Sequence, residues 1–140
     1  MAASWAERWP DRVATSIAYS SEQAHQIFAG SDFFLMPSIF EPCGQSQIYS
    51  MQYGTIPIGH AVGGLADTIR PYPKKGSTGF LFSPFTAEAY CNTVESAVEV
   101  YHQPRRWKPF VKRVMRVDFS VSKMAEEYLK LYARIMEKMA

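Results

Sequence analysis

A regular alternation of short apolar runs with longer amphipathic stretches is the feature of this chain that most constrains its fold. The runs at residues 33–36, 55–59 and 79–82 are short and bounded by glycine, proline or aspartate, which is typical of buried strands. Residues 12–19 give a fourth predicted strand. Parallel strands need long crossover connections, and the stretches between these runs have helical spacing. We therefore expect an α/β fold in which helices flank a parallel sheet of about four strands.

The amphipathic stretches predict six helices and a less regular N-terminus. The helices are expected at residues 21–29, 46–53, 65–69, 87–101, 107–115 and 121–139. Residues around Trp5 and Trp9 form either a short helix before Pro10 or a loose lead-in. Pro57 lies inside one strand run, so we expect a local irregularity there, because proline cannot donate to a sheet ladder.

The last predicted helix carries an apolar stripe. Its members are Val121, Met124, Tyr128, Leu131, Tyr132 and Ile135. Burying a side chain of this size is worth roughly 1.5–3 kcal/mol. We therefore expect the stripe to pack on its own domain or to self-associate, or else the helix to fray.

The charge balance does not indicate a nucleic-acid partner. The chain has 140 residues, of which 47% are hydrophobic and 20% charged, as in a single globular domain. Its net charge is only +2. A local group of cations is interpreted as a solvated helix surface rather than a binding face: Arg105, Arg106, Lys112, Arg113 and Arg116.

Cysteine usage and hydropathy exclude further classes. Cys43 and Cys91 lie in different predicted elements without metal-ligand spacing, so we expect free thiols and no metal site. No apolar run approaches the ~20 residues of a membrane span, and the first residues have no signal-peptide pattern. We therefore expect a protein that is neither membrane-bound nor secreted.

The loop after the 33–36 strand is the main candidate site. Glu41 lies there, at the carboxyl end of a strand, where open α/β sheets bind ligands. Gly44 permits close backbone approach, and a helix is expected to begin at Ser46. The free N–H groups of Gly44, Gln45 and Ser46 would then point out of the helix start and could hold an anion such as a diphosphate.

Three motifs in order connect this chain to a known family. They are Glu41-Pro42-Cys43-Gly44, the segment from Met51 to Pro57, and the segment from Gly63 to Thr68. With these motifs, nearly the whole chain resembles the last third of the bacterial glycogen synthases and plant starch synthases that use ADP-glucose. The resemblance implies a GT-B enzyme, which has two Rossmann-like domains facing across a cleft. Residues 1–119 would be part of the second, nucleotide-sugar-binding domain, and residues 120–140 a helix that crosses to the first domain.

The resemblance also implies roles for individual residues. Glu41 would bind hydroxyls of the donor glucose and stabilise positive charge at its anomeric carbon, which suits a carboxylate. Backbone N–H groups of Gly44, Gln45 and Ser46 would hold the diphosphate, and the backbone of Cys43 would lie near the sugar.

Two further contacts follow from the family. Tyr19 would stack on adenine, and Gly63 with Gly64 would turn the backbone beside the sugar or acceptor. Plain structural roles are the alternatives for these three residues. No metal or cofactor is implied beyond the donor substrate.

Some family features are absent from the sequence. Gln45 and Ser46 replace the common Leu and Thr, and Tyr49 stands where many related transferases have an acid for the ribose. The cationic diphosphate clamp, and the histidine and Lys-x-Gly-Gly-Leu loop of the first domain, are not in the chain. We therefore expect this chain alone to be inactive, because sugar transfer needs a closed cleft, and we interpret Met1 as the start of a truncated gene.

The resemblance bears on topology as well. In the family, two strands lie between the counterparts of residues 12–19 and 33–36. Without them, we expect these two strands to pair directly, with pairing to another chain as the second choice, because unpaired edges are costly.

Two alternatives stay open at this stage. One is a transferase for another nucleotide sugar, and the other is a non-catalytic domain that binds glucan or a partner enzyme. In the main interpretation the partners are a nucleotide sugar, an α-glucan and the first GT-B domain. The compartment would be the plastid stroma for a plant or alga and the cytoplasm for a bacterium.

Overall fold

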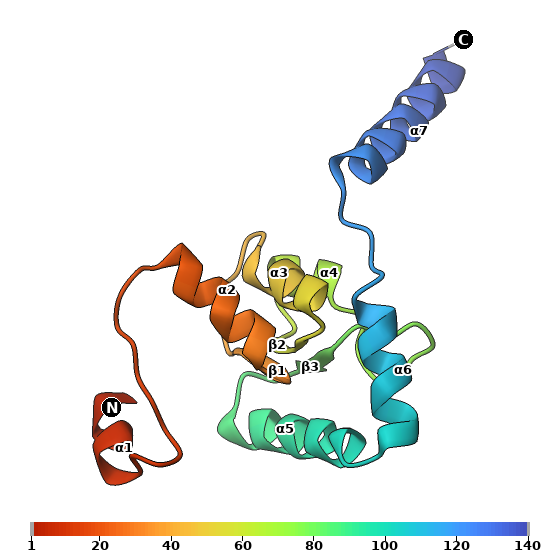
Figure 1. Ribbon diagram of the computed structural model, residues 1–140. Coiled ribbons are helices and arrows are strands. Elements are labelled where there is room, and N and C mark those ends of the chain that lie inside the picture. The colour runs from red at the N-terminus through yellow and green to blue at the C-terminus, as the bar shows by residue number, and fades with distance from the viewer. Residues whose placement is uncertain (1, 140) are drawn as a thin grey trace.

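The protein is a small α/β body with a helix extending from each end (Figure 1). The computed structural model describes the backbone of residues 2–139 and the side chains of residues 4–139. The elements are α1 (Ala2–Arg8), α2 (Ser21–Gly30), β1 (Phe33–Met36), α3 (Ser46–Tyr53), β2 (Ile56–His60), α4 (Gly63–Thr68), β3 (Phe80–Phe82), α5 (Ala87–Tyr101), α6 (Pro104–Val114) and α7 (Val121–Met139).

Three strands form one parallel sheet in the order β1-β2-β3. Phe33 pairs with Ile56 at the start of the first ladder, and Ile58 pairs with Phe80 at the start of the second. The α/β class, the parallel sheet and the flanking helices are therefore confirmed. The sheet has three strands where we expected about four.

The predicted strand at residues 12–19 is wrong. This segment is irregular and joins α1 to α2 without pairing with any described strand. Ile17 and Tyr19 are 87% and 99% exposed. Its direct pairing with β1 is therefore also wrong. A strand is stabilised by ladder bonds and by burial of its side chains, and this segment obtains neither.

The irregularity expected at Pro57 does not occur. β2 runs without a break, with Pro57 opposite Phe34 of β1. The Ile56 N–H donates to Asp32 O on the β1 side, so the next residue directs its nitrogen toward β3. The ladder to β3 starts only at Ile58. Pro57 therefore lacks its N–H on the side where β3 offers no paired residue, and no ladder hydrogen bond is lost.

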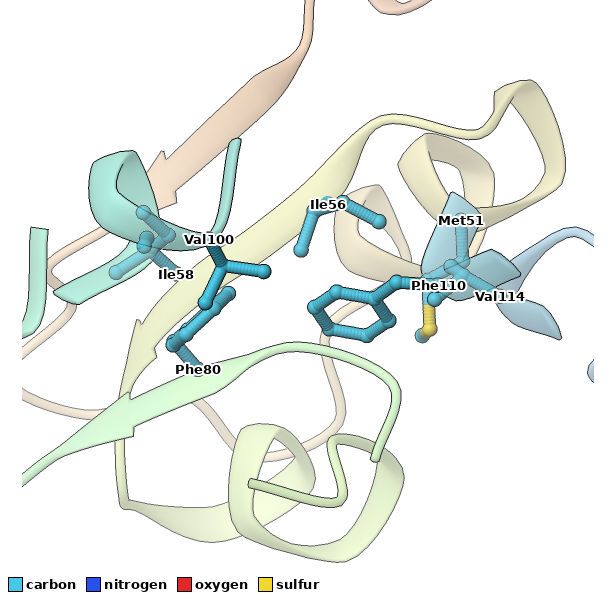
Figure 2. Close-up of a cluster of buried hydrophobic side chains, with 8 residues drawn as sticks. Met51, Ile56, Ile58, Phe80, Val100, Phe110 and Val114 are labelled. Carbon is cyan, nitrogen blue, oxygen red and sulfur yellow. The ribbon is translucent and has the colours of Figure 1, made fainter. Parts of the chain in front are cut away.

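The core lies where α5 and α6 meet the sheet. Figure 2 shows Phe110 of α6 between Ile56 of β2 and Met51 of α3, with Phe80 and Val100 nearby. On the other face, Gly59 of β2 lies against Leu65 of α4 and against Ile69. Helices thus cover both faces of the sheet, as a parallel sheet requires.

Helix α7 extends away from this body at the end of an irregular linker (Figure 1). It begins after Ser120, whose hydroxyl accepts the Lys123 N–H at 3.2 Å, as the sequence predicts. None of its described side chains is buried, so the apolar stripe does not pack on its own domain in the described chain. None of the described helices is long and apolar enough to cross a membrane.

Candidate functional site

Two loops meet at the carboxyl ends of β1 and β2. The loop after β1 contains Glu41 and leads into α3, and the turn after β2 contains Gly63 and Gly64 at the start of α4. Because β1 and β2 are parallel neighbours, their carboxyl ends lie side by side. The Gly64 N–H donates to the backbone oxygen of Glu41 at 2.9 Å. The structure therefore brings together the residues predicted from the two motifs.

The two glycines fit because they have no side chains. A Cβ atom on Gly64 would lie 1.7 Å from the Cys43 carbonyl oxygen. A Cβ atom on Gly63 would lie 2.1 Å from the Glu41 carbonyl oxygen, and Gly63 has a φ of +43°. Both obstacles are backbone atoms, which cannot rotate away as a side chain can. The turn after β2 thus packs directly against the backbone of the loop after β1 and supports it.

A buried glutamine holds the same loop from within. Gln47 has no exposed surface. Its Nε2 donates to Gly44 O at 3.0 Å, to Cys43 O at 3.3 Å and to the hydroxyl of Thr68 at 3.1 Å. Its Oε1 is buried without a hydrogen-bond partner among the described residues. Gln47 therefore connects the loop, α3 and α4.

Sequence reasoning missed Gln47, although a signal was present. α3 buries Gln47, Ser50 and Met51, which follow the spacing of a helix face. A glutamine four residues before a core methionine lies on the apolar face, where an amide needs partners. Its position just after the motif then points to the loop backbone as that partner.

Glu41 is half-buried and carries no ion pair among the described residues. The Ser38 hydroxyl donates to its Oε2 at 3.3 Å. The Ser38 carbonyl is in turn 2.9 Å from Nδ1 of His60, at the end of β2. The sequence pattern assigns no role to His60. In the structure it holds the start of the loop that carries Glu41.

The start of α3 presents unpaired backbone donors. Gly44 has a φ of +67°, and Gln45 is the N-cap without a side-chain hydrogen bond. Within the described residues, the N–H groups of Gly44, Gln45 and Ser46 donate to no protein acceptor. Such a helix start favours an anion.

The remaining predicted site residues are more exposed. The Cys43 thiol is free and the residue is exposed. Its backbone carbonyl oxygen faces Gln47 and Gly64. Tyr19 lies in the irregular segment before α2, and none of the other described residues packs on its ring, which is 99% exposed. Its stacking on adenine stays a prediction. Tyr49 tilts against the His25 ring at 6.0 Å. No group of three or more metal-ligating side chains occurs in the described part of the chain.

This arrangement combines two chemical functions. A carboxylate without a cationic partner can accept hydroxyls or oppose a developing positive charge. The adjacent N–H groups can hold phosphate oxygens. Together they suit a ligand in which a sugar is joined to a phosphate.

Comparisons with known proteins identify the family of this chain. Residues 7–114 match the family model described as "Glycosyl transferases group 1". A glycogen synthase from Bacillus cereus (strain Q1) is 45% identical over 134 residues, covering 94% of this chain and 28% of the relative. The chain therefore spans less than a third of the length of that enzyme.

Two solved structures resemble the fold. The catalytic domain of starch synthase IV from Arabidopsis thaliana, bound to ADP and acarbose, superposes with a TM-score of 0.83 at 32% identity. The match covers 94% of this chain and 28% of that one. A sucrose-phosphate synthase from Thermosynechococcus elongatus gives a TM-score of 0.65 at 26% identity, over 97% of this chain and 34% of that one.

Proposed function

Because this chain belongs to the group 1 glycosyl transferases, we propose that it is the donor-binding C-terminal part of a starch or glycogen synthase. The complete enzyme is a retaining transferase that moves glucose from ADP-glucose to the non-reducing end of an α-1,4-glucan. This chain supplies one wall of the cleft.

One observation carries the proposal. The Glu41 loop is held from two sides, by Gly64 at its backbone and by Gln47 beneath it. A catalytic carboxylate must be held in position relative to the reacting carbon, and such support from the scaffold provides this. The same support fixes the unpaired N–H groups at the start of α3. In this proposal, Glu41 and the N–H groups that hold the phosphates are therefore positioned by the same supports.

The donor assignment is supported by the related proteins. The starch synthase IV domain, which this chain resembles at a TM-score of 0.83, was solved with ADP bound. In our proposal the ADP diphosphate lies against the N–H groups of Gly44, Gln45 and Ser46. Glu41 accepts sugar hydroxyls and stabilises the oxocarbenium-like charge as the bond to the diphosphate breaks. Tyr19 contacts adenine in the complete enzyme.

By itself the chain is inactive in this proposal. The cationic diphosphate clamp that the family resemblance implies is not among the residues of this chain, and no ion pair of the described residues involves the start of α3. An acceptor and an opposing wall are also needed to exclude water. We expect no glucan elongation from ADP-glucose by the purified 140-residue chain.

A chimaera provides the sharpest test. The corresponding segment of the Bacillus cereus glycogen synthase, to which this chain is 45% identical, is replaced by this chain. The expected result is glucan elongation with ADP-glucose. Glu41→Gln in the chimaera should reduce kcat by about 100-fold or more, because it removes the charge that faces the transition state.

The control is Glu22→Gln, which removes an exposed acid from the first turn of α2. This variant should keep the activity of the parent chimaera. A folded, active chimaera in which Glu41→Gln elongates glucan as fast as Glu22→Gln would contradict the assignment of Glu41.

A second candidate is a transferase for another nucleotide sugar. It is supported by the resemblance to a sucrose-phosphate synthase. Elongation by the chimaera with ADP-glucose and UDP-glucose as competing donors separates the two. A preference for UDP-glucose would favour the second candidate. A non-catalytic glucan-binding role would instead give glucan capture by the chain that does not depend on nucleotide.

A further inference from the structure

Helix α6 and the loop before β3 form a basic groove away from the Glu41 loop. The groove has a volume of about 620 Å³. Its cations are Arg70, Lys112, Arg113, Arg116 and Lys123. The only acid that lines it is Asp118. These side chains come from three separate segments, so the groove is a product of the fold.

A second basic groove continues from the first. It has a volume of about 380 Å³ and is lined by Lys74, Lys75, Arg105 and Arg106. Gly76, Pro109 and Arg113 line both grooves. The two grooves therefore form one continuous surface, which we call the α6 basic surface.

The net charge of the chain is small, but its cations are concentrated on this surface. The α6 basic surface contains nine of the 15 Lys and Arg residues but one of the 13 Asp and Glu residues. The ion pairs of the described residues all lie in α7, and Lys123 is the one cation of the surface that takes part. The other eight have no carboxylate partner within 4–139. The basic cluster read from the sequence as a solvated helix surface is thus joined by cations from distant segments.

Arg113 lies at the junction of the grooves and is already held in place. Its Nε donates to Ser77 O at 2.9 Å, and its Nη2 donates to Ser77 Oγ at 3.1 Å. Its guanidinium also stacks on the Phe110 ring at 4.9 Å. Because Ser77 is 2% exposed, this anchor is fixed by the protein interior. The centre of the surface is therefore preorganised.

We propose that the α6 basic surface binds an oligophosphate, a ligand that carries two or more phosphate groups. Five of its nine cations are arginines, whose planar donors match phosphate oxygens in pairs. Two adjoining grooves suit several linked phosphates better than a single one. The surface is separate from the start of α3, so it is not the donor site.

The surface is poorly suited to nucleic-acid bases. Tyr72 and Phe110 are its aromatic residues. Phe110 is 1% exposed, and Tyr72 packs on Phe80 and Phe110 with ring separations of 5.3 and 6.1 Å. Phe110 thus offers no face on which a base could stack, and the Tyr72 ring is already engaged with the core.

The test is a calorimetric titration of the 140-residue chain with sodium tripolyphosphate and, separately, with inorganic phosphate. Tripolyphosphate should bind at least about tenfold more tightly, and its affinity should fall as salt is raised, because exposed charges are screened. The variant R70Q/K112Q/R116Q should weaken tripolyphosphate binding by about tenfold or more. All three side chains are exposed, so the variant should fold.

The control variant R12Q/R134Q/K138Q removes the same charge from exposed positions outside the grooves. It should leave tripolyphosphate affinity within about twofold. An equal loss in both variants would show attraction by net charge only and would overturn the site. In an NMR titration with tripolyphosphate, amide shifts confined to α3, with none at Ser77 or Arg113, would overturn the site as well. Equal affinities for phosphate and tripolyphosphate would contradict the oligophosphate assignment.

Discussion

At the scale of single residues, the site depends on close contact between two backbone segments. Gly64→Ala would place a methyl group 1.7 Å from the Cys43 carbonyl oxygen. The loop must move, and we expect the free energy of unfolding to fall by about 1–3 kcal/mol. Urea unfolding followed by circular dichroism measures this. Gly30→Ala is a matched control, because a Cβ there meets no atom within 4 Å. If both variants were equally stable, the contact would not support the loop.

Gln47 tests the same loop from inside. Gln47→Leu removes the three bonds from Nε2 and leaves the carbonyl groups of Cys43 and Gly44 without this donor. We expect a loss of about 1–3 kcal/mol in the free energy of unfolding. Gln52→Leu changes an exposed glutamine of the same helix and should have little effect. Wild-type stability of Gln47→Leu would show that the amide bonds are not needed.

The sequence located the loop and the glycine pair but not their supports. The family resemblance singled out Gly63 and Gly64, and the structure brings their turn against the Glu41 loop because β1 and β2 are parallel neighbours. Gln47 and His60 were not predictable, because their roles depend on which carbonyl groups tertiary packing places beside them. Tyr19 differs from these residues, because the family resemblance implies that it stacks on adenine, and that role stays a prediction.

At the scale of elements, the hydrophobic pattern correctly predicted the three strands that form the sheet. The three runs that became strands are those that neighbouring strands and helices can bury. The run at residues 12–19 has β-branched residues but no partner strand among the described residues. Strand propensity depends on such a neighbour, so sequence alone could not decide this element. α6 also begins earlier than predicted, at Pro104, because proline suits the first turn of a helix.

Hydrogen exchange tests whether the segment between α1 and α2 lacks strand structure. Amides of residues 14–19 should exchange rapidly, because they donate to no acceptor among the described residues and the side chains there are exposed. Amides of Ile56 and Ile58 in β2 should exchange far more slowly, since both side chains are buried between helices and sheet. Protection of residues 14–19 equal to that of β2 in a monomer would mean that the segment does pair within the chain.

Acidification should loosen α7. The Ser120 N–H donates to Asp118, and the Lys130 ammonium donates to Glu127, which lowers the pKa of both carboxyl groups. A lowered pKa in the helix favours the charged carboxylate, so this support is present above the unfolded pKa values and is lost as pH falls through the helical ones. Far-UV circular dichroism should show helix content falling between about pH 5 and pH 2. The double variant D118N/E127Q should flatten this change, and an unchanged pH profile would contradict it.

At the scale of the whole molecule, the chain is an α/β body with a long exposed helix at its C-terminal end. The body brings a carboxylate and a helix start with unpaired N–H groups to one edge of a parallel sheet. The chain spans 28% of the length of the glycogen synthase that it matches. The apolar stripe of α7 is exposed throughout, with Val121 at 75% and Ile135 at 44%. In our proposal the first GT-B domain covers this helix and closes the cleft.

The most direct test of the donor site is a titration of the isotopically labelled chain with ADP, followed by NMR. We expect weak binding, with a Kd on the order of a millimolar, because the start of α3 acts without a cationic clamp. The amides of Gly44, Gln45 and Ser46 should move most, and they should do so equally in the R70Q/K112Q/R116Q variant. Largest shifts in α7, or saturable binding that leaves these three amides unchanged, would contradict the account.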